Sequence, residues 1–150
     1  MRILPMTMSK PNNWEFEDLA VGYQTELIPC KISETDNQDF ASISGNWNPL
    51  HTDPEFARLK GYKDCPLYGM LLASKFSYLL GMVLPGKDSV CLTQSLRFHK
   101  PVFIDETFYL RGTVLSKSES TRIVVIKTEI LDAGGALAVD GEAQVLIKSR

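Results

Sequence analysis

One apolar segment, from Met70 to Leu84, limits the folds open to this chain more than any other feature. It is broken only by Ser74, Lys75 and Ser77. It is also too short to cross a bilayer as a helix, which needs about 20 apolar residues. We therefore expect a helix that is buried in the core of the protein.

The residues after this helix follow a different pattern. Four long stretches rich in β-branched and aromatic residues, 89–102, 106–118, 121–133 and 136–149, are separated by turn sequences such as SKSES and DAGG. This pattern predicts an antiparallel meander. A curved sheet that wraps the apolar helix buries the apolar faces of both, so the sequence predicts an α+β fold with a long central helix.

Shorter elements are expected before the central helix: a strand over residues 23–32, a helix over 33–44, and a second short helix over 52–61. In the first of these helices, Phe40 and Ile43 share one face, and Gly45 follows its last residue. We expect residues 1–13 to be a flexible segment and residues 14–150 to form a single domain.

Composition narrows the classes of function. A chain of 150 residues with 44% hydrophobic residues can bury one core. A net charge of −2, with scattered lysines and arginines, gives no footprint for nucleic acid. The start MRILPMTMSKPNN lacks the apolar run of a secretion signal, and three cysteines cannot form a full disulfide framework. We therefore expect buried thiols in a cytoplasmic protein that binds neither nucleic acid nor membrane.

The segment GNWNPLH, residues 45–51, gathers polar groups between two predicted helices. It holds His51, one of only 2 histidines in the chain, and Asn46 precedes it. An imidazole can act as a general base, whereas an amide can hold a water but accepts no proton at neutral pH. From the residues alone, His51 could instead pack at a loop–helix junction, and Asn46 could be an ordinary turn residue.

The sequences DFASISGNWNPLHTDPEFA, YGMLLASKFSYLLGMVLPG and SLRFHKPVFIDET resemble the MaoC-like hydratase family, and within it the R-specific enoyl-CoA hydratases. The resemblance runs from residue 14 to the end of the chain. It implies a hot-dog fold, a homodimer with active sites at the dimer interface, an acyl thioester substrate, and no metal or redox cofactor. It also implies a set of site residues: catalytic Asn46 and His51, an oxyanion hole at Gly69, and supporting Asn48, Tyr68 and Ser77.

Two positions depart from the family pattern. Asn46 stands where the family signature has its catalytic aspartate, and Tyr68 stands where a histidine commonly precedes the oxyanion-hole glycine. Hydration needs a base for the attacking water, an acid for the α-carbon, and donors for the thioester oxygen. An amide in place of one acid–base group implies a rate lower by about a hundredfold or more. Such a change, whether natural or introduced, also gives an enzyme that traps its substrate.

Three functions stay open at this point. The first is an R-specific enoyl-thioester hydratase or 3-hydroxyacyl-thioester dehydratase acting on coenzyme A or carrier-protein substrates. The second is an isomerase that moves the double bond of an enoyl thioester with His51 alone. The third is a dimer that binds acyl thioesters without catalysis. Coenzyme A would favour basic residues at the tunnel mouth, for which Lys60, Lys63 and Arg97 are candidates, whereas His99 is expected to be exposed on the sheet.

Overall fold

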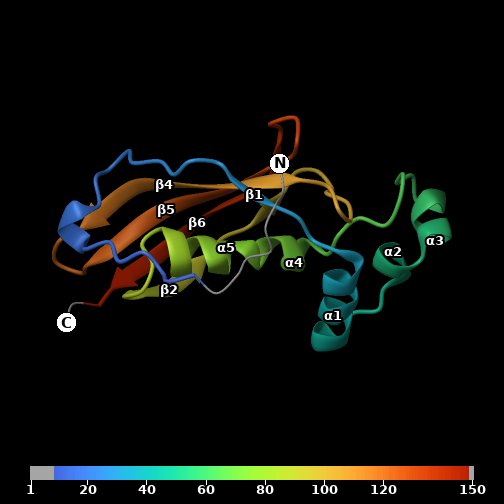
Figure 1. The fold of residues 1–150 in the computed structure, drawn as a ribbon, viewed down its shortest axis with the longest axis horizontal. Helices are drawn as coiled ribbons and strands as arrows, with labels where there is room; N and C mark the ends of the chain where they lie inside the picture. The colour runs from blue at the N-terminus through green and yellow to red at the C-terminus, as the bar shows by residue number, and fades with distance from the viewer. Residues whose placement is uncertain (1–8, 149–150) are drawn as a thin grey trace.

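The computed structural model describes residues 9–148 of the chain, which are built around an antiparallel sheet (Figure 1). Long strands at its centre supply most of the pairing, and shorter strands flank them. In spatial order the strands are β1 (Ile28–Cys30), β4 (Phe108–Ser118), β5 (Ile123–Leu131), β6 (Leu137–Ile147) and β2 (Ser89–Gln94), and the short β3 (Arg97–Phe98) also pairs with β6.

The predicted central helix is confirmed as a helical segment that lies along the sheet (Figure 1). It consists of α4 (Gly69–Ala73), α5 (Lys75–Tyr78) and the wider turn η2 (Leu79–Val83). Ser74 separates α4 from α5, and its hydroxyl donates to the Leu71 carbonyl at 2.6 Å. Such side-chain bonds to the preceding turn compete with the helix and bend it. The buried cluster between helix and sheet includes Leu72, Phe76, Leu79, Leu110, Ile130 and Val139.

The predicted four-strand meander is correct for three strands and wrong for the fourth. β4, β5 and β6 follow one another in chain and in space, but β2 pairs with β6 rather than with β4. Residues 99–107 carry the chain across to the other side of the sheet, where β4 lies between β1 and β5. The stretch predicted as one strand is also divided into β2 and β3, where Ser95 passes over Gly141. A Cβ at Gly141 would lie 1.8 Å from the Ser95 carbonyl oxygen.

Three helices form a lobe beyond one end of the sheet (Figure 1), and we call it the helical lobe: α1 (Glu34–Ser44), α2 (Pro49–Thr52) and α3 (Pro54–Leu59). Ser33 caps α1 in a capping box with Asp36, and Gly45 ends it with φ +74°. Phe40 on the predicted face is half-buried, whereas Ile43 is 85% exposed. The reason is that α1 extends away from the sheet.

The N-terminal part of the described chain is held against the end of the central helix. Asn12 donates from its backbone to Met82 and from its side chain to Val83, at 2.9 and 3.0 Å. Packed contacts therefore reach back beyond residue 14, while most of the segment predicted as flexible lies outside the described residues. Cys30 and Cys65 are buried as expected, but Cys91 on β2 is exposed. No helix among residues 9–148 is long and apolar enough to cross a membrane.

Candidate active site

Two consecutive helix caps shape the loop that carries the sequence motif. The Asn48 side chain accepts from the Leu50 N–H at 2.9 Å and so starts α2, where Pro49 is the first residue. Asp53 accepts from the Glu55 N–H at 3.0 Å and starts α3. His51 lies between these caps in the one turn of α2. Asn48 was expected to shape the loop, and its side-chain hydrogen bond to the Leu50 N–H does so.

The His51 ring is fixed by two contacts. Its Nδ1 lies 2.7 Å from the carbonyl oxygen of Pro66. A carbonyl only accepts, so Nδ1 carries the hydrogen and Nε2 keeps the free lone pair. The ring also stacks on Tyr68, with centroids 4.1 Å apart and planes inclined by 28°. These contacts hold the imidazole in the tautomer that a general base needs.

Tyr68 also connects the histidine to Asn46. The Tyr68 hydroxyl donates to the backbone oxygen of Asn46 at 2.5 Å, and the tyrosine itself is buried. Burial first, and then the nearby Cys65, raises the pKa of Tyr68, so the hydroxyl stays a neutral donor. The side-chain oxygen of Asn46 accepts from the Asn48 N–H at 3.1 Å, within the loop itself. Asn46 is therefore linked to the His51 ring through Tyr68, and its own side chain, which is exposed, bonds within the turn and does not line the pocket beside that ring.

A pocket of about 280 Å³ opens beside the His51 ring. Gly69, the first residue of α4, lies on its wall, and its N–H has no acceptor within its own helix. A Cβ at this position would lie 2.8 Å from Cε1 of Phe98, another lining residue, so a side chain here would displace that ring and fill the approach to the N–H. The other lining residues are Leu50, Tyr62, Pro66, Leu67, Leu72, His99, Lys100 and Pro101.

The structure brings most of the predicted site residues together, with some exceptions. His51 and Gly69 line this pocket, and Tyr68, Asn46 and Asn48 hold the loop around it. Ser77 lies in a different pocket of about 380 Å³, against β2, together with Phe76, Leu80 and Cys91. None of the basic residues proposed for the tunnel mouth lines the His51 pocket: Lys60 lies over the Phe56 ring, Lys63 pairs with Glu106, and Arg97 lies in a pocket beside Asp140.

Sequence reasoning missed two groups that the fold adds to this site. His99 is exposed, as expected, but it also lines the same pocket as His51. Its Nε2 lies 2.7 Å from a carboxylate oxygen of Asp140 on β6. No local pattern reveals this pair, because its members are far apart in the chain and meet only when β3 aligns with β6. Lys100, the next residue, also lines the pocket.

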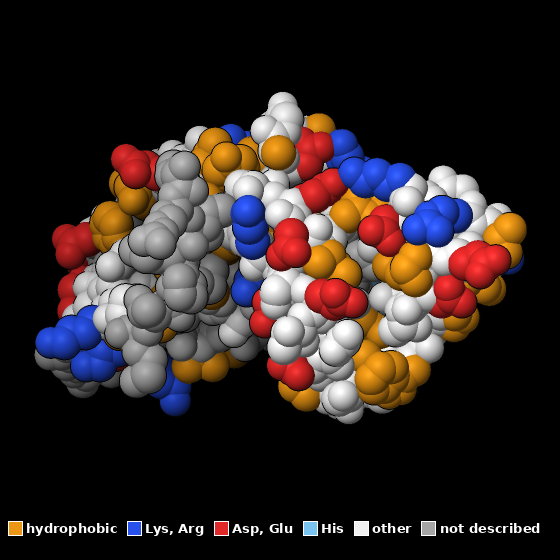
Figure 2. All heavy atoms as spheres, turned by 45° about the vertical axis from the view of Figure 1, so that its right-hand side comes forward, with side chains coloured by type: hydrophobic (Ala, Val, Ile, Leu, Met, Phe, Trp, Pro, Cys, Tyr) orange, Lys and Arg blue, Asp and Glu red, His pale blue; other side chains and the backbone are white. Residues whose placement is uncertain are grey.

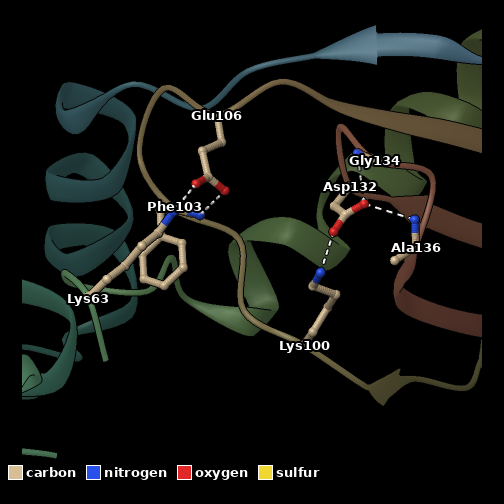
Figure 3. A network of polar contacts seen from close by, with 7 residues as sticks. All are labelled: Lys63, Lys100, Phe103, Glu106, Asp132, Gly134 and Ala136. Carbon is tan, nitrogen blue, oxygen red and sulfur yellow. Dashed lines mark hydrogen bonds and ion pairs between the residues drawn. The ribbon is translucent and has the colours of Figure 1, made fainter. Parts of the chain in front are cut away.

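Two lysines near the pocket already have acidic partners, as Figure 3 shows. Lys63 donates to Glu106 at 2.6 Å and lies over the Phe103 ring. Lys100 forms an ion pair with Asp132, which also accepts from the Gly134 and Ala136 N–H groups. The hydrogen bond from Lys100, followed by that from Ala136, lowers the pKa of Asp132. These pairs flank a second hollow of about 440 Å³ that shares Lys100 and Pro101 with the first.

This fold and site define a member of a known class. The MaoC-like domain model matches residues 18–134, so the chain belongs to the MaoC-like family. It is 42% identical over 129 residues to an (R)-specific enoyl-CoA hydratase of Aeromonas caviae, covering 86% of this chain and 96% of that protein. It is 36% identical to a mitochondrial 3-hydroxyacyl-[acyl-carrier-protein] dehydratase of Arabidopsis thaliana, covering 77% of this chain and 70% of that one.

Solved structures agree with these sequence matches. An R-hydratase from Pseudomonas aeruginosa, in its unliganded form, superposes with a TM-score of 0.86 at 32% identity, covering 95% of this chain and 90% of that one. The (R)-hydratase from Aeromonas caviae gives a TM-score of 0.83 at 40% identity, covering 88% of this chain and 99% of that one. The α+β hot-dog fold predicted from the sequence is therefore confirmed.

Proposed function

We propose that this chain is an R-specific 2-enoyl-thioester hydratase, which in the reverse direction dehydrates 3-hydroxyacyl thioesters. The observation that carries the proposal is that His51 and Gly69 share one pocket of about 280 Å³. In one small cavity, the base can accept the proton of the attacking water, and the helix N-terminus can stabilise the negative charge that develops on the thioester oxygen. The enoyl-CoA hydratase and the dehydratase among the relatives support the same reaction.

His51 activates the water in this proposal. The Pro66 carbonyl accepts the Nδ1 hydrogen, so Nε2 is the nitrogen that takes the proton as the water oxygen bonds to C3. The imidazolium that results is stabilised by the same carbonyl and by the face of the Tyr68 ring, which lies in stacking contact. Both contacts favour the charged form that develops during the reaction.

Gly69 receives the opposite charge. As C3 gains the oxygen, electrons shift to the thioester oxygen, and the Gly69 N–H at the start of α4 donates to it. The missing side chain lets the carbonyl approach the backbone closely. Apolar neighbours such as Leu67 and Leu72 line the same pocket and exclude competing water from the enolate.

Asn46 limits the rate in this proposal. Its amide cannot accept a proton, and its oxygen already accepts from the Asn48 N–H. The carboxylate of the family signature would supply a second acid–base group, which contributes about a hundredfold or more. We therefore expect this protein to hydrate its substrate more slowly than a protein with a carboxylate at position 46. We expect the loop geometry to be the same in both.

The substrate in this proposal is an acyl thioester of coenzyme A or of a carrier protein. The lysines beside the pocket, Lys63 and Lys100, are each bound to a carboxylate, so a phosphate of coenzyme A must compete with Glu106 or Asp132. Comparing kcat/KM for crotonyl-CoA and for crotonyl carrier protein identifies the better carrier. A cytoplasmic location remains a prediction of the sequence.

A homodimer completes the proposal, as the family resemblance implies. The edge strand β2 exposes Val90 and Leu92, which are 40% and 50% exposed. The helical lobe exposes Ile43 and Leu59, and Figure 2 shows hydrophobic side chains on its surface. Light scattering at micromolar concentration should give the mass of a dimer, and Leu92→Lys should weaken it. A monomer under these conditions would contradict this part of the proposal.

One experiment tests the reaction itself. The protein is incubated with crotonyl-CoA, and with a longer 2-enoyl thioester, in deuterated water. Formation of the (R)-3-hydroxyacyl product with deuterium at C2 supports the hydratase. A product with only a moved double bond supports the isomerase instead, and binding without any product supports a non-catalytic dimer. His51→Ala should abolish turnover, whereas Glu142→Gln, at an exposed carboxylate on β6, should not.

A further inference from the structure

A second histidine occupies the pocket of the proposed reaction. His99 follows β3, and its backbone N–H donates to the Ala138 carbonyl at 2.8 Å, which fixes it beside β6. His99 lines the pocket that also contains His51 and Gly69. The side chain is 41% exposed, so it can exchange protons with solvent. Nothing in the steps described so far uses this imidazole.

Asp140 orients the second histidine. Its carboxylate oxygen lies 2.7 Å from His99 Nε2, so this nitrogen carries a hydrogen and Nδ1 is left for another partner. When the ring is protonated, the two side chains form an ion pair. An imidazole held by a carboxylate is the arrangement that enzymes use to orient an acid–base group.

The charged groups around this pair are few and identifiable. Arg97 lies opposite Asp140 in the pairing of β3 with β6. Lys127 and Glu142 line the hollow on the other side of Asp140. Lys100 follows His99 in the chain, but its ammonium is bound to Asp132. On the pocket side, the other titratable side chains are His51 and Tyr62.

We propose that His99, held by Asp140, is the second acid–base group of this pocket and performs the proton transfer that the amide of Asn46 cannot perform. The inference rests on the hydratase function proposed above. It names a catalytic residue outside the motif that carries the family resemblance. It would give a chain with an amide at position 46 the second proton transfer that hydration needs.

The proton steps balance with this pair. His51 Nε2 takes a proton from water as the water oxygen bonds to C3 and the C2–C3 π electrons move toward the thioester oxygen. Protonated His99 then gives its Nδ1 proton to C2, which leaves the neutral 3-hydroxyacyl thioester. His51 ends protonated and His99 neutral, and transfer through solvent water restores both. No oxidant, metal or other co-reactant enters these steps.

The test is a double-mutant cycle on hydration of crotonyl-CoA. His99→Gln is measured in the protein with Asn46 and again in the Asn46→Asp variant. We expect a loss in kcat of about a hundredfold in the first background, the usual weight of one acid–base group. We expect a clearly smaller loss in the second, because the new carboxylate supplies the missing group. A merely structural role for His99 would give equal losses in both backgrounds and would overturn the inference.

Two further measurements keep the test decisive. Asp140→Asn should slow kcat in the same direction as His99→Gln, while Glu142→Gln on the same strand serves as the matched control. His99→Gln should also remove one limb of the pH profile of kcat/KM. If His99→Gln fails to fold by thermal melting, Asp140→Asn carries the cycle in its place. An unchanged pH profile, or an Asp140→Asn protein as active as the control, contradicts the proposal.

Failure of this inference differs from failure of the proposed function. A protein that hydrates crotonyl-CoA equally well with and without His99 keeps its proposed function and loses only this residue assignment. A protein that binds crotonyl-CoA without hydrating it, even as Asn46→Asp, overturns both.

Discussion

The rings of His51 and Tyr68 stack with their centroids 4.1 Å apart, and the hydroxyl of the same tyrosine donates to the backbone oxygen of Asn46 at 2.5 Å. One buried side chain therefore holds both the candidate base and the loop in front of it. Each of these contacts can be removed separately.

Tyr68→Phe removes the hydroxyl and keeps the stacked ring. We expect a loss of stability of about 1 kcal/mol, the usual net contribution of one hydrogen bond. We also expect a lower kcat, because the loop around Asn46 loses its anchor, with faster amide hydrogen exchange over residues 45–48. Tyr23→Phe, at a partly exposed tyrosine, is the control for loss of a hydroxyl. Wild-type exchange rates in the loop of the Tyr68→Phe protein would count against the anchor.

Asn46→Asp should increase the rate of water addition by about a hundredfold or more, since a carboxylate can exchange a proton where the amide cannot, in addition to the transfer assigned to His99. The structure predicts no rearrangement, because a carboxylate oxygen can accept from the Asn48 N–H as the amide oxygen does. His51→Ala should abolish hydration in both backgrounds. If the Asn46→Asp protein binds crotonyl-CoA but turns it over no faster than the protein with Asn46, this assignment is wrong.

Gly69→Ala tests the oxyanion position. Its Cβ would lie 2.8 Å from Cε1 of Phe98, but this ring is 53% exposed and can turn away. The change in stability should therefore be under about 1 kcal/mol, within the range of helix propensity differences. The methyl group fills the approach to the Gly69 N–H, so kcat/KM should fall by about a hundredfold. Gly81→Ala, where a Cβ meets nothing within 4 Å, is the matched control.

The ionisation of Glu129 on β5 makes the free energy of unfolding depend on pH. Burial alone raises the pKa of Glu129, but hydrogen bonds from Arg111 at 2.9 Å and Lys127 at 3.2 Å outweigh it, and the pKa is lowered. A lowered pKa in the folded state means that the carboxylate stabilises the protein above its unfolded pKa. This contribution is lost as the pH falls through the folded value.

Glu129→Gln should therefore destabilise the protein at neutral pH by about 1–3 kcal/mol, since Arg111 loses its charged partner. The difference from wild type should narrow as the solution is acidified below the usual pKa of a glutamate. Urea unfolding at pH 7 and at pH 3 measures this. Glu119→Gln, at an exposed glutamate, should show a small and constant difference. If the loss of unfolding free energy caused by Glu129→Gln is the same at both pH values, ionisation of Glu129 does not contribute to the pH dependence of stability.

The sequence predicted those parts of the fold that depend on local patterns. The apolar run over residues 70–84 predicted the central helix, and Gly45 marked the end of α1 with its positive φ. The neighbours of β2 could not be predicted, because alternation of side chains reveals a strand but not its partner. The same limit applies to the site. His51 lies in a local motif, whereas His99 reaches the pocket only through the pairing of β3 with β6.

The helical lobe has a consequence for how this protein can change over time. Its reactive loop is built by its own caps, Asn48 and Asp53, and the buried clusters on the sheet contain neither His51 nor Asn46. Selection can therefore alter the chemistry of the loop with little effect on folding of the core. Codons for asparagine and aspartate differ by a single base. A single base change can therefore remove a carboxylate at position 46 or restore it, and the folded core stays the same in both cases.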